Sequence, residues 1–221
     1  MGLDMYLYKT KKTEEATPDQ LVALNSYFDY IGRPEKYKDS TPEEWDGLDM
    51  SDVRDDLIPL YQSEYIHRYM AWDKDHRYEY KTIFENVAYW RKANQIHGWF
   101  VKNVQDEEDD CGYYEVSKED LEDLLNTCKT VQAGSEIVPG KIKNGDRLVD
   151  GKWIPIMEDG YIIKNPDVAK QLLPVREGFF FGSYEYTQWY MQDITYTIDI
   201  LTEILEKTDF EHEVVLYHAF W

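Results

Sequence analysis

Two strand-like segments lie near the two ends of the chain, and they constrain its fold more than any other feature. Both the first, Leu3–Tyr8, and the last, Val214–Tyr217, are rich in strand-forming residues. Strands at the two ends of a chain often pair within one sheet, and no Gly, Ser or Pro linker divides the sequence between them. The chain has 221 residues, which is long for one average domain and short for two. We therefore predict a single domain over residues 1–221.

Two long amphipathic helices are predicted to pack on this sheet. In residues 83–104, a mostly apolar stripe recurs at three- and four-residue steps and comprises Val87, Trp90, Asn94, His97, Val101 and Val104. In residues 187–207, a second stripe comprises Tyr190, Ile194, Ile198, Leu201 and Leu205. Helices and strands together predict the α+β class, with a mixed, mainly antiparallel sheet.

Helix-start signals predict shorter helices elsewhere. Thr17-Pro18-Asp19-Gln20 provides an N-cap, a proline at the first helical position and a Gln that returns to the cap, so we expect a helix over 17–31. Thr41–Glu44 repeats this signal, and residues 51–61 form a weaker helical segment. Ser117–Asp120 resembles a capping box in which Asp replaces Glu, and it predicts a further helix.

Three dipeptides in the second half of the chain predict tight turns: Asn144-Gly145, Asp150-Gly151 and Asp159-Gly160. Each pair accepts positive φ angles at little cost, as tight hairpin turns require. Apolar residues between the dipeptides supply the strands. This spacing predicts a β-meander or a pair of hairpins.

The formal net charge is −20, from 44 acidic and 24 basic residues. Binding to duplex nucleic acid depends on neutralising phosphates, so no direct nucleic-acid partner is expected. Negative charge favours solubility. It also permits a DNA-like surface that binds a nucleic-acid-binding protein in place of DNA. A DNA mimic should carry its acids in a regular stripe, whereas these acids are dispersed except for Asp106–Asp110. Solubility is therefore the preferred interpretation.

The cysteine content and the hydropathy of the sequence predict the cellular compartment of the protein. Two cysteines, Cys111 and Cys128, are too few for a disulfide framework and indicate reduced thiols. A transmembrane helix needs a run of about 20 apolar residues, and the sequence contains none. The N-terminus lacks the basic and apolar segments of a secretory signal. We expect a cytoplasmic protein with no membrane partner.

The acidic loop carries part of a known metal-binding motif. Asp106, Glu108 and Asp110 begin with EF-hand spacing, but Cys111 replaces the required Gly and Ser117 the final Glu. A solvated acidic loop is expected there, with a loose Mg²⁺ or Ca²⁺ contact as the alternative. The sequence has no nucleophile elbow, no Cys-x-x-Cys pair and no dinucleotide fingerprint. We therefore expect no cofactor, no metal site and no catalytic motif.

Four residues of the first predicted helix form a candidate ligand site: Trp90, Arg91, Asn94 and His97. On a helix these positions adjoin one another. Arg offers forked donors, Asn a donor and an acceptor, and Trp a face for stacking, a combination that suits an anionic or heterocyclic ligand. The alternative is that Asn94 and His97 are hydrogen-bonded core residues and Arg91 lies at the surface.

A second candidate segment runs from Phe180 to Trp189 and contributes Phe180, Ser183, Gln188 and Trp189. Gly182 allows close approach of a ligand to the backbone, and the N-terminus of the following helix favours anions. Arg176, just before this segment, is one of few candidate cations. We expect the two candidate segments to converge in space. The alternative is a hydrophobic strand or loop followed by an ordinary helix cap.

Four stretches carry a resemblance to a known group: Gly2–Leu7, Tyr89–His97, Asp110–Tyr114 and Gly178–Gly182. They resemble a family of uncharacterised small proteins from bacteriophages and bacterial genomes whose members open with Met-Gly-Leu-Asp-Met-Tyr-Leu. The resemblance runs along nearly the whole chain. It implies no catalytic residues, because the shared segments carry no mechanism. A phage or mobile-element setting implies an accessory role, such as blunting host defence or redirecting host metabolism.

Three functions are compatible with these observations. The first is non-enzymatic sequestration of a nucleotide-like ligand that the host uses in immunity. The second is inhibition of a host protein through the acidic surface. The third is a small hydrolase or transferase that uses His97 as general base, for which the sequence offers no partner residue. We favour the first, and the oligomeric state is left open.

Overall fold

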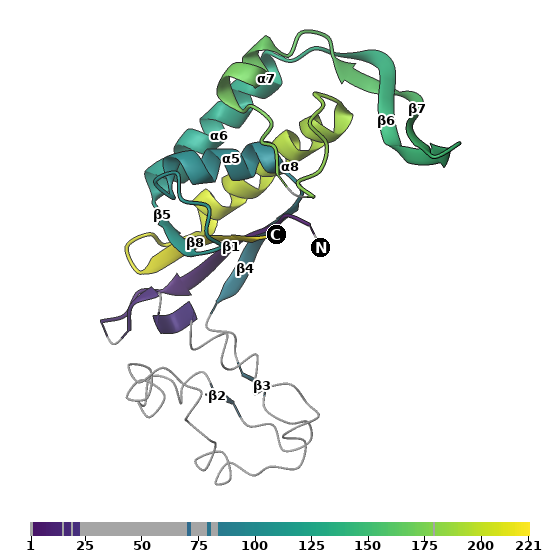
Figure 1. Cartoon of the computed structure of the whole chain (residues 1–221). Coiled ribbons are helices and arrows are strands. Elements are labelled where there is room, and N and C mark those ends of the chain that lie inside the picture. Colours follow the sequence, from purple (N-terminus) through teal and green to yellow (C-terminus); the bar gives the residue numbers. More distant parts are fainter. Residues whose placement is uncertain are drawn as a thin grey trace. The chain divides into compact units, whose positions relative to one another are not determined.

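The computed structural model describes residues 2–14, 16–18, 20–22, 70–71, 79–80, 84–178 and 180–221 (Figure 1). It contains helices and antiparallel strands, which confirms the α+β class. The chain divides into two compact units. The first comprises Met1–Tyr8, Asn86–Glu211 and Val215–Trp221, and the second comprises Lys9–Glu85 and His212–Val214. That these units form a single domain stays a prediction.

The N-terminal helix prediction is confirmed at its start. The Thr17 hydroxyl accepts a hydrogen bond from the Gln20 backbone, and the Gln20 side chain accepts one from the Thr17 backbone, as in a capping box. Beyond residue 22, the helix expected to residue 31 lies outside the described residues, as do the predicted segments at 41–44 and 51–61. Two short strands, β2 (Met70–Ala71) and β3 (Glu79–Tyr80), pair with each other.

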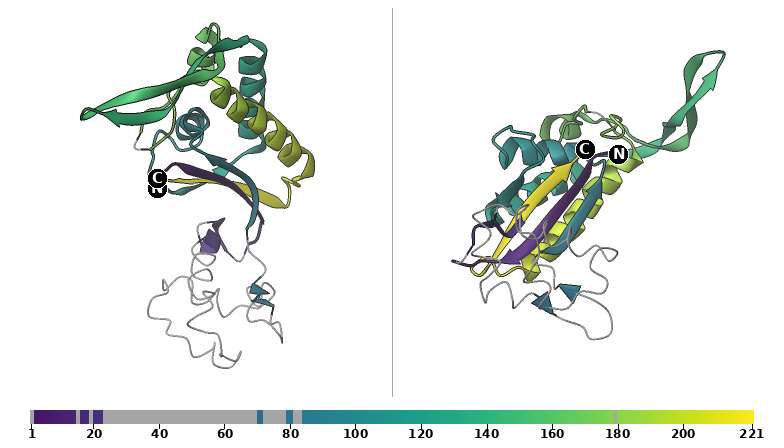
Figure 2. Two further views of the ribbon diagram at one scale, coloured as in Figure 1. Left: turned by 90° about the vertical axis from the view of Figure 1, so that its right-hand side faces the viewer. Right: turned by 60° about the horizontal axis from the view of Figure 1, so that its bottom comes forward.

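A four-stranded sheet contains both strands that were predicted near the chain ends. Its order is β4 (Glu85–Arg91), β1 (Asp4–Lys11), β8 (Glu213–Phe220) and β5 (Tyr113–Val116). β5 pairs antiparallel with β8. Figure 2 shows the arrow of β1 running opposite to those of its neighbours β4 and β8. The predicted pairing of the two terminal segments in one sheet is therefore confirmed.

The helix predicted over 83–104 is wrong in its first half. Residues 85–91 form β4, and only Asn94–Asn103 form a helix, α5. Lys92 separates them with a positive φ of 63°, and its backbone N–H donates to the Leu3 carbonyl. Buried positions Ala88 and Trp90 alternate with more exposed neighbours, a strand period that a short apolar run cannot distinguish from a helical one.

The helices at Lys118–Ala133 and Gln188–Lys207 begin close to their predicted starts. α6 (Lys118–Ala133) starts with a complete capping box between Ser117 and Asp120. α7 (Asp167–Leu172) is short, and α8 (Gln188–Lys207) is the second long helix that the sequence predicted. α5, α6 and α8 lie over one face of the sheet (Figures 1 and 2). No helix in the described part of the chain is both long and apolar enough to cross a membrane.

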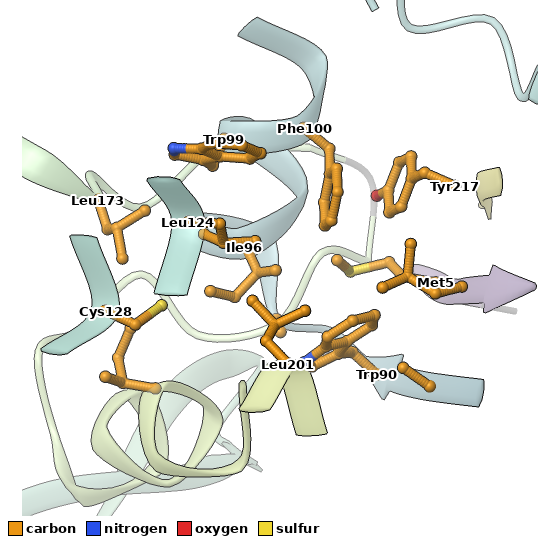
Figure 3. Packing of buried hydrophobic residues seen from close by; sticks show 14 of the residues in the cluster. Met5, Trp90, Ile96, Trp99, Phe100, Leu124, Cys128, Leu173, Leu201 and Tyr217 are labelled. Carbon is orange, nitrogen blue, oxygen red and sulfur yellow. The ribbon is translucent and has the colours of Figure 1, made fainter. Parts of the chain in front are cut away.

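The hydrophobic core lies between these helices and the sheet. Leu3, Met5 and Leu7, at alternate positions in or next to β1, are fully buried. Figure 3 shows Met5 and Trp90 of the sheet facing Ile96 of α5 and Leu201 of α8. Because side chains alternate along a strand, the residues between these buried positions point to the opposite face of the sheet.

A single long hairpin replaces the predicted β-meander or pair of hairpins. β6 (Ile137–Val149) and β7 (Lys152–Ile163) pair antiparallel along their length. Only Asp150-Gly151 forms a turn, with positive φ at both residues. Asn144-Gly145 lies at a register shift between Lys143 and Asp146, which is a β-bulge. Gly160 lies within β7 opposite Gly140, and the Ile142 side chain leaves no room for a Cβ at Gly160.

Candidate ligand-binding face of the sheet

Trp90 and Arg91 point to opposite faces of the sheet because they are consecutive residues of β4 rather than helix neighbours. Trp90 is 2% exposed, and its indole N–H donates to the Thr197 hydroxyl at 2.9 Å. The Arg91 side chain is exposed, and its Nε lies 3.9 Å from the Asp4 carboxylate. Of these two predicted ligand residues, only Arg91 is therefore accessible.

Asn94 joins the two candidate segments. Its side chain bonds to backbone groups, not to the side chains, of the second segment. Its amide N–H₂ group donates to the carbonyl oxygens of Phe181, at 3.1 Å, and Ser183, at 2.9 Å. Its amide oxygen accepts from the Arg176 backbone N–H at 2.9 Å. The side chain is buried and hydrogen-bonded through both its nitrogen and its oxygen. The two segments meet at Asn94, which holds the loop in place, but Arg91 points to the face of the sheet away from α8, the helix that begins with Gln188.

His97 is buried with both ring nitrogens engaged. Its Nε2–H donates to the Asp109 carboxylate at 3.1 Å, and its Nδ1 accepts from the Tyr217 hydroxyl at 2.8 Å. Arg176 donates to the same Asp109 oxygen at 2.9 Å. Burial lowers the pKa of His97, although Asp109 opposes this effect. A neutral imidazole that is fully enclosed and doubly hydrogen-bonded has no nitrogen free for a substrate, so the geometry does not favour His97 as a general base.

The residues predicted in the second segment occupy separate positions. Phe180 is exposed in a loop with a φ of 59°, and the Ser183 side chain is also exposed. Gln188 is the first residue of α8, and its side-chain oxygen accepts from the Tyr161 backbone N–H at 2.9 Å. Trp189 is exposed on the same helix. Phe180 and Phe181 therefore lie in a loop, which was one of the two predicted alternatives for this stretch.

The face of the sheet opposite the helices carries a group of rings that we call the aromatic face. The rings belong to Tyr6, Tyr8, Tyr89, Tyr113, His218 and Phe220. All four strands contribute: β4 and β5 at the two edges, and β1 and β8 in the centre. Tyr89 is 40% exposed and Phe220 is 50% exposed. The aromatic face therefore presents ring surface to solvent.

Ring contacts run continuously across the sheet. The centroid of Tyr6 lies 5.1 Å from that of Tyr89 and 6.4 Å from that of His218. His218 stacks on Tyr113 with centroids 4.0 Å apart and an interplanar angle of 1°. Phe220 lies 6.5 Å from His218 and nearly parallel to it. Rings that are fixed by their neighbours lose little side-chain entropy when a planar ligand stacks on them.

Polar groups border the aromatic face at its β4 edge. The Tyr89 hydroxyl donates to the Asp4 carboxylate, and this hydrogen bond raises the pKa of Tyr89. Burial raises the pKa of Tyr6, so both phenols are neutral at physiological pH. Burial lowers the pKa of His218. The neutral rings therefore offer stacking surfaces, and the Arg91 guanidinium beside Tyr89 offers donors to an anion.

Sequence reasoning missed the aromatic face, although a signal for it was present. In β1, Asp4, Tyr6 and Tyr8 alternate with the buried Leu3, Met5 and Leu7. In β8, His218 and Phe220 alternate with buried Tyr217 and Ala219 in the same way. An alternation of apolar residues with rings predicts a strand whose second face is also aromatic. The neighbouring strands could not be identified from this signal.

The last two carboxylates of the acidic loop 106–110 bind other residues of the protein. Asp109 is held by His97 and Arg176. Asp110 accepts from the Gly112 backbone and from the Tyr114 hydroxyl, both at 2.8 Å, and these bonds lower the pKa of Asp110. This loop therefore has a role in anchoring β5 to α5.

Comparison of the chain with protein-family models, with curated proteins and with solved structures found no match.

Proposed function

We propose that the protein is a non-enzymatic binding protein that captures a small, nucleotide-like ligand on the aromatic face. The observation that carries this proposal is the row of rings in mutual contact across all four strands. Stacking of a base on an aromatic side chain is worth about 1–3 kcal/mol and requires only a planar partner. Tyr89 and Phe220 expose more ring surface than the other residues of this face and are the proposed stacking partners for the heterocycle of the ligand.

Charge favours a small ligand over a nucleic-acid strand. The chain carries a net charge of −20, which opposes the close approach of a polyanion. Arg91 borders the rings with an exposed side chain, and its several N–H donors are not all used by Asp4. One or two phosphate groups can bind there through charge-assisted hydrogen bonds. The proposed ligand is therefore a nucleotide with one or two phosphates.

We further propose that binding occurs in the cytoplasm and serves sequestration. The resemblance to bacteriophage and bacterial proteins supports this part of the proposal. A phage accessory protein that binds a nucleotide signal without converting it lowers the free concentration of that signal. Such a protein needs affinity and abundance, but no turnover.

Isothermal titration calorimetry with adenosine monophosphate, adenosine and inorganic phosphate tests this function. We expect adenosine monophosphate to bind more tightly than adenosine, and phosphate alone to give no measurable heat. Native mass spectrometry of the purified protein should also detect any ligand retained from the producing cells. If no common nucleotide binds and no small molecule is retained, the proposed function is wrong.

Substitutions separate stacking from charge recognition. The double variant Tyr89→Leu, Phe220→Leu keeps apolar area but removes two rings. It should weaken the binding of adenosine monophosphate at least tenfold. Trp189→Leu, which removes an exposed ring elsewhere, is the matched control and should leave binding unchanged. Arg91→Gln should weaken binding of adenosine monophosphate but not binding of adenosine. Lys129→Gln, on α6, should change the binding of neither ligand. Equal binding by all four variants would exclude the aromatic face as the site.

A further inference from the structure

The outer part of the β6–β7 hairpin exposes large apolar side chains. We call residues 137–163 the arm. Trp153 is 71% exposed, Leu148 is 59% exposed and Met157 is 49% exposed. Leu148 pairs directly with Trp153, and Met157 lies four residues further along β7, so all three side chains lie on one face of the ribbon.

The opposite face of the arm is also apolar near its tip, where Val149, Ile154 and Ile156 are exposed. An isolated two-stranded hairpin is at best marginally stable in water, because neither of its faces is covered. Contiguous exposed apolar surface on such an element marks a site of protein association.

Charge separates the arm from the rest of the chain. The arm holds four basic residues (Lys141, Lys143, Arg147, Lys152) and four acidic residues (Asp146, Asp150, Glu158, Asp159), so its net charge is 4 − 4 = 0. The remaining residues therefore carry the whole net charge of −20. Two copies of the chain repel each other wherever their acidic surfaces meet, but not where their arms meet.

A pocket of about 460 Å³ lies where the arm meets α8. Ile137 and Tyr161 line it from the arm, and Met191, Thr195 and Tyr196 line it from α8. Tyr161 lies eight residues from Trp153 on β7, an even number, so both side chains lie on the same ribbon face. One face of the arm thus carries an exposed indole near its tip and an apolar pocket at its base, eight residues apart along β7.

We propose that the chain forms a twofold-symmetric dimer in which two arms pack face to face and antiparallel, each Trp153 entering the base pocket of the other copy. The occupant is a second copy because the same face supplies both the ring and the pocket. A twofold axis therefore satisfies both copies at once and closes the assembly. Contact between the arms brings two surfaces of zero net charge together, and Asp199 of α8 is the acidic residue in the lining of the base pocket. This dimer does not depend on the proposed ligand.

Sedimentation equilibrium tests the dimer directly. We expect the wild-type chain to be dimeric at micromolar concentration. Trp153→Lys should weaken association by at least about 30-fold, because a Trp that fills a pocket of its partner is commonly a hot spot. Trp189→Lys, which changes an exposed Trp on α8 away from the lining of the pocket, is the matched control and should leave the dimer intact. A wild-type monomer, or a dimer unaffected by Trp153→Lys, would overturn the proposal.

Disulfide trapping tests the predicted contact between tip and base. The exposed native thiol is first removed by Cys111→Ser, and the buried Cys128 is retained. A copy carrying Trp153→Cys, mixed with a copy carrying Gln192→Cys at the pocket, should form a mixed disulfide under mild oxidation. Glu206→Cys, exposed near the far end of α8, replaces Gln192→Cys in the control and should not cross-link. Equal cross-linking of both pairs would contradict the antiparallel arrangement.

Discussion

Trp90 and Tyr89 are neighbours in β4, yet Trp90 is 2% exposed in the core and Tyr89 is 40% exposed on the aromatic face. The same contrast holds across the whole sheet. On the face covered by helices, polar side chains such as Asn94 and His97 are enclosed and bonded to the chain. On the other face, rings reach solvent. Residue type alone therefore does not show which residues are available to a ligand. The alternation of side chains along each strand determines whether a residue faces the core or the solvent.

The largest expected effect on stability is that of Trp90→Ala on the covered face. Removal of a buried indole leaves a cavity and one hydrogen bond fewer at the Thr197 hydroxyl, which still donates to the Asp193 carbonyl, and should lower the free energy of unfolding by about 3–5 kcal/mol. Urea denaturation followed by circular dichroism measures this change. A loss below about 1 kcal/mol would mean that the covered face is not packed as described.

Asn94→Ala should have the next largest effect. It leaves two carbonyl oxygens and one N–H of the 176–183 loop without their partner, at an expected cost of about 2–4 kcal/mol. Asn126→Ala, at an exposed position of α6, is the matched control and should change stability by less than about 0.5 kcal/mol. Similar losses for both variants would show that Asn94 does not hold the loop.

Asp193→Asn should stabilise the protein in a pH-dependent way. Burial raises the pKa of Asp193 from 3.8 to about 6, although a hydrogen bond from Gln95 opposes this effect. A raised carboxyl pKa contributes stability below pH 3.8, and this contribution is lost as the pH rises through about 6. The variant should therefore exceed the wild type by about 1–2 kcal/mol at pH 8 and match it near pH 3.5. Denaturation curves at both pH values measure the difference, and a gain that is independent of pH would contradict this explanation.

Tyr89→Ala should have the smallest effect on stability, less than about 1 kcal/mol, because its ring is partly exposed and its hydrogen bond to Asp4 lies at the surface. The same variant should bind adenosine monophosphate more weakly than the wild type. A large loss of stability would show that the aromatic face is a structural layer of the protein and would weaken the proposed function.

Much of the fold could be predicted from local signals. The Thr17–Gln20 and Ser117–Asp120 capping boxes, the α8 stripe and the terminal strands are encoded by short-range chemistry. The segment 83–104 could not be assigned correctly, because Val87, Trp90 and Asn94 fit a helical period as well as Ala88 and Trp90 fit a strand period. The break at Lys92 depends on a backbone pairing with Leu3, far away in the sequence.

The candidate site was less predictable than the fold. Arg91 was identified as a candidate cation and is exposed, and the two candidate segments meet at the buried Asn94 rather than around one ligand site. Burial of Asn94 and His97 depends on Phe181, Asp109 and Tyr217, which are assembled only in the tertiary structure. The aromatic face depends on the order and register of four strands, which no local pattern specifies.

The strand order β4-β1-β8-β5 also governs how the sheet is completed during synthesis. β8 is the last described element to leave the ribosome, and it is the strand that lies between β1 and β5. The β6–β7 hairpin can close earlier from contiguous residues, whereas the inner edges of β1 and β5 wait for residues 213–220. Until then the nascent chain exposes two strand edges and the apolar arm, so a slow or truncated synthesis leaves an intermediate prone to aggregation.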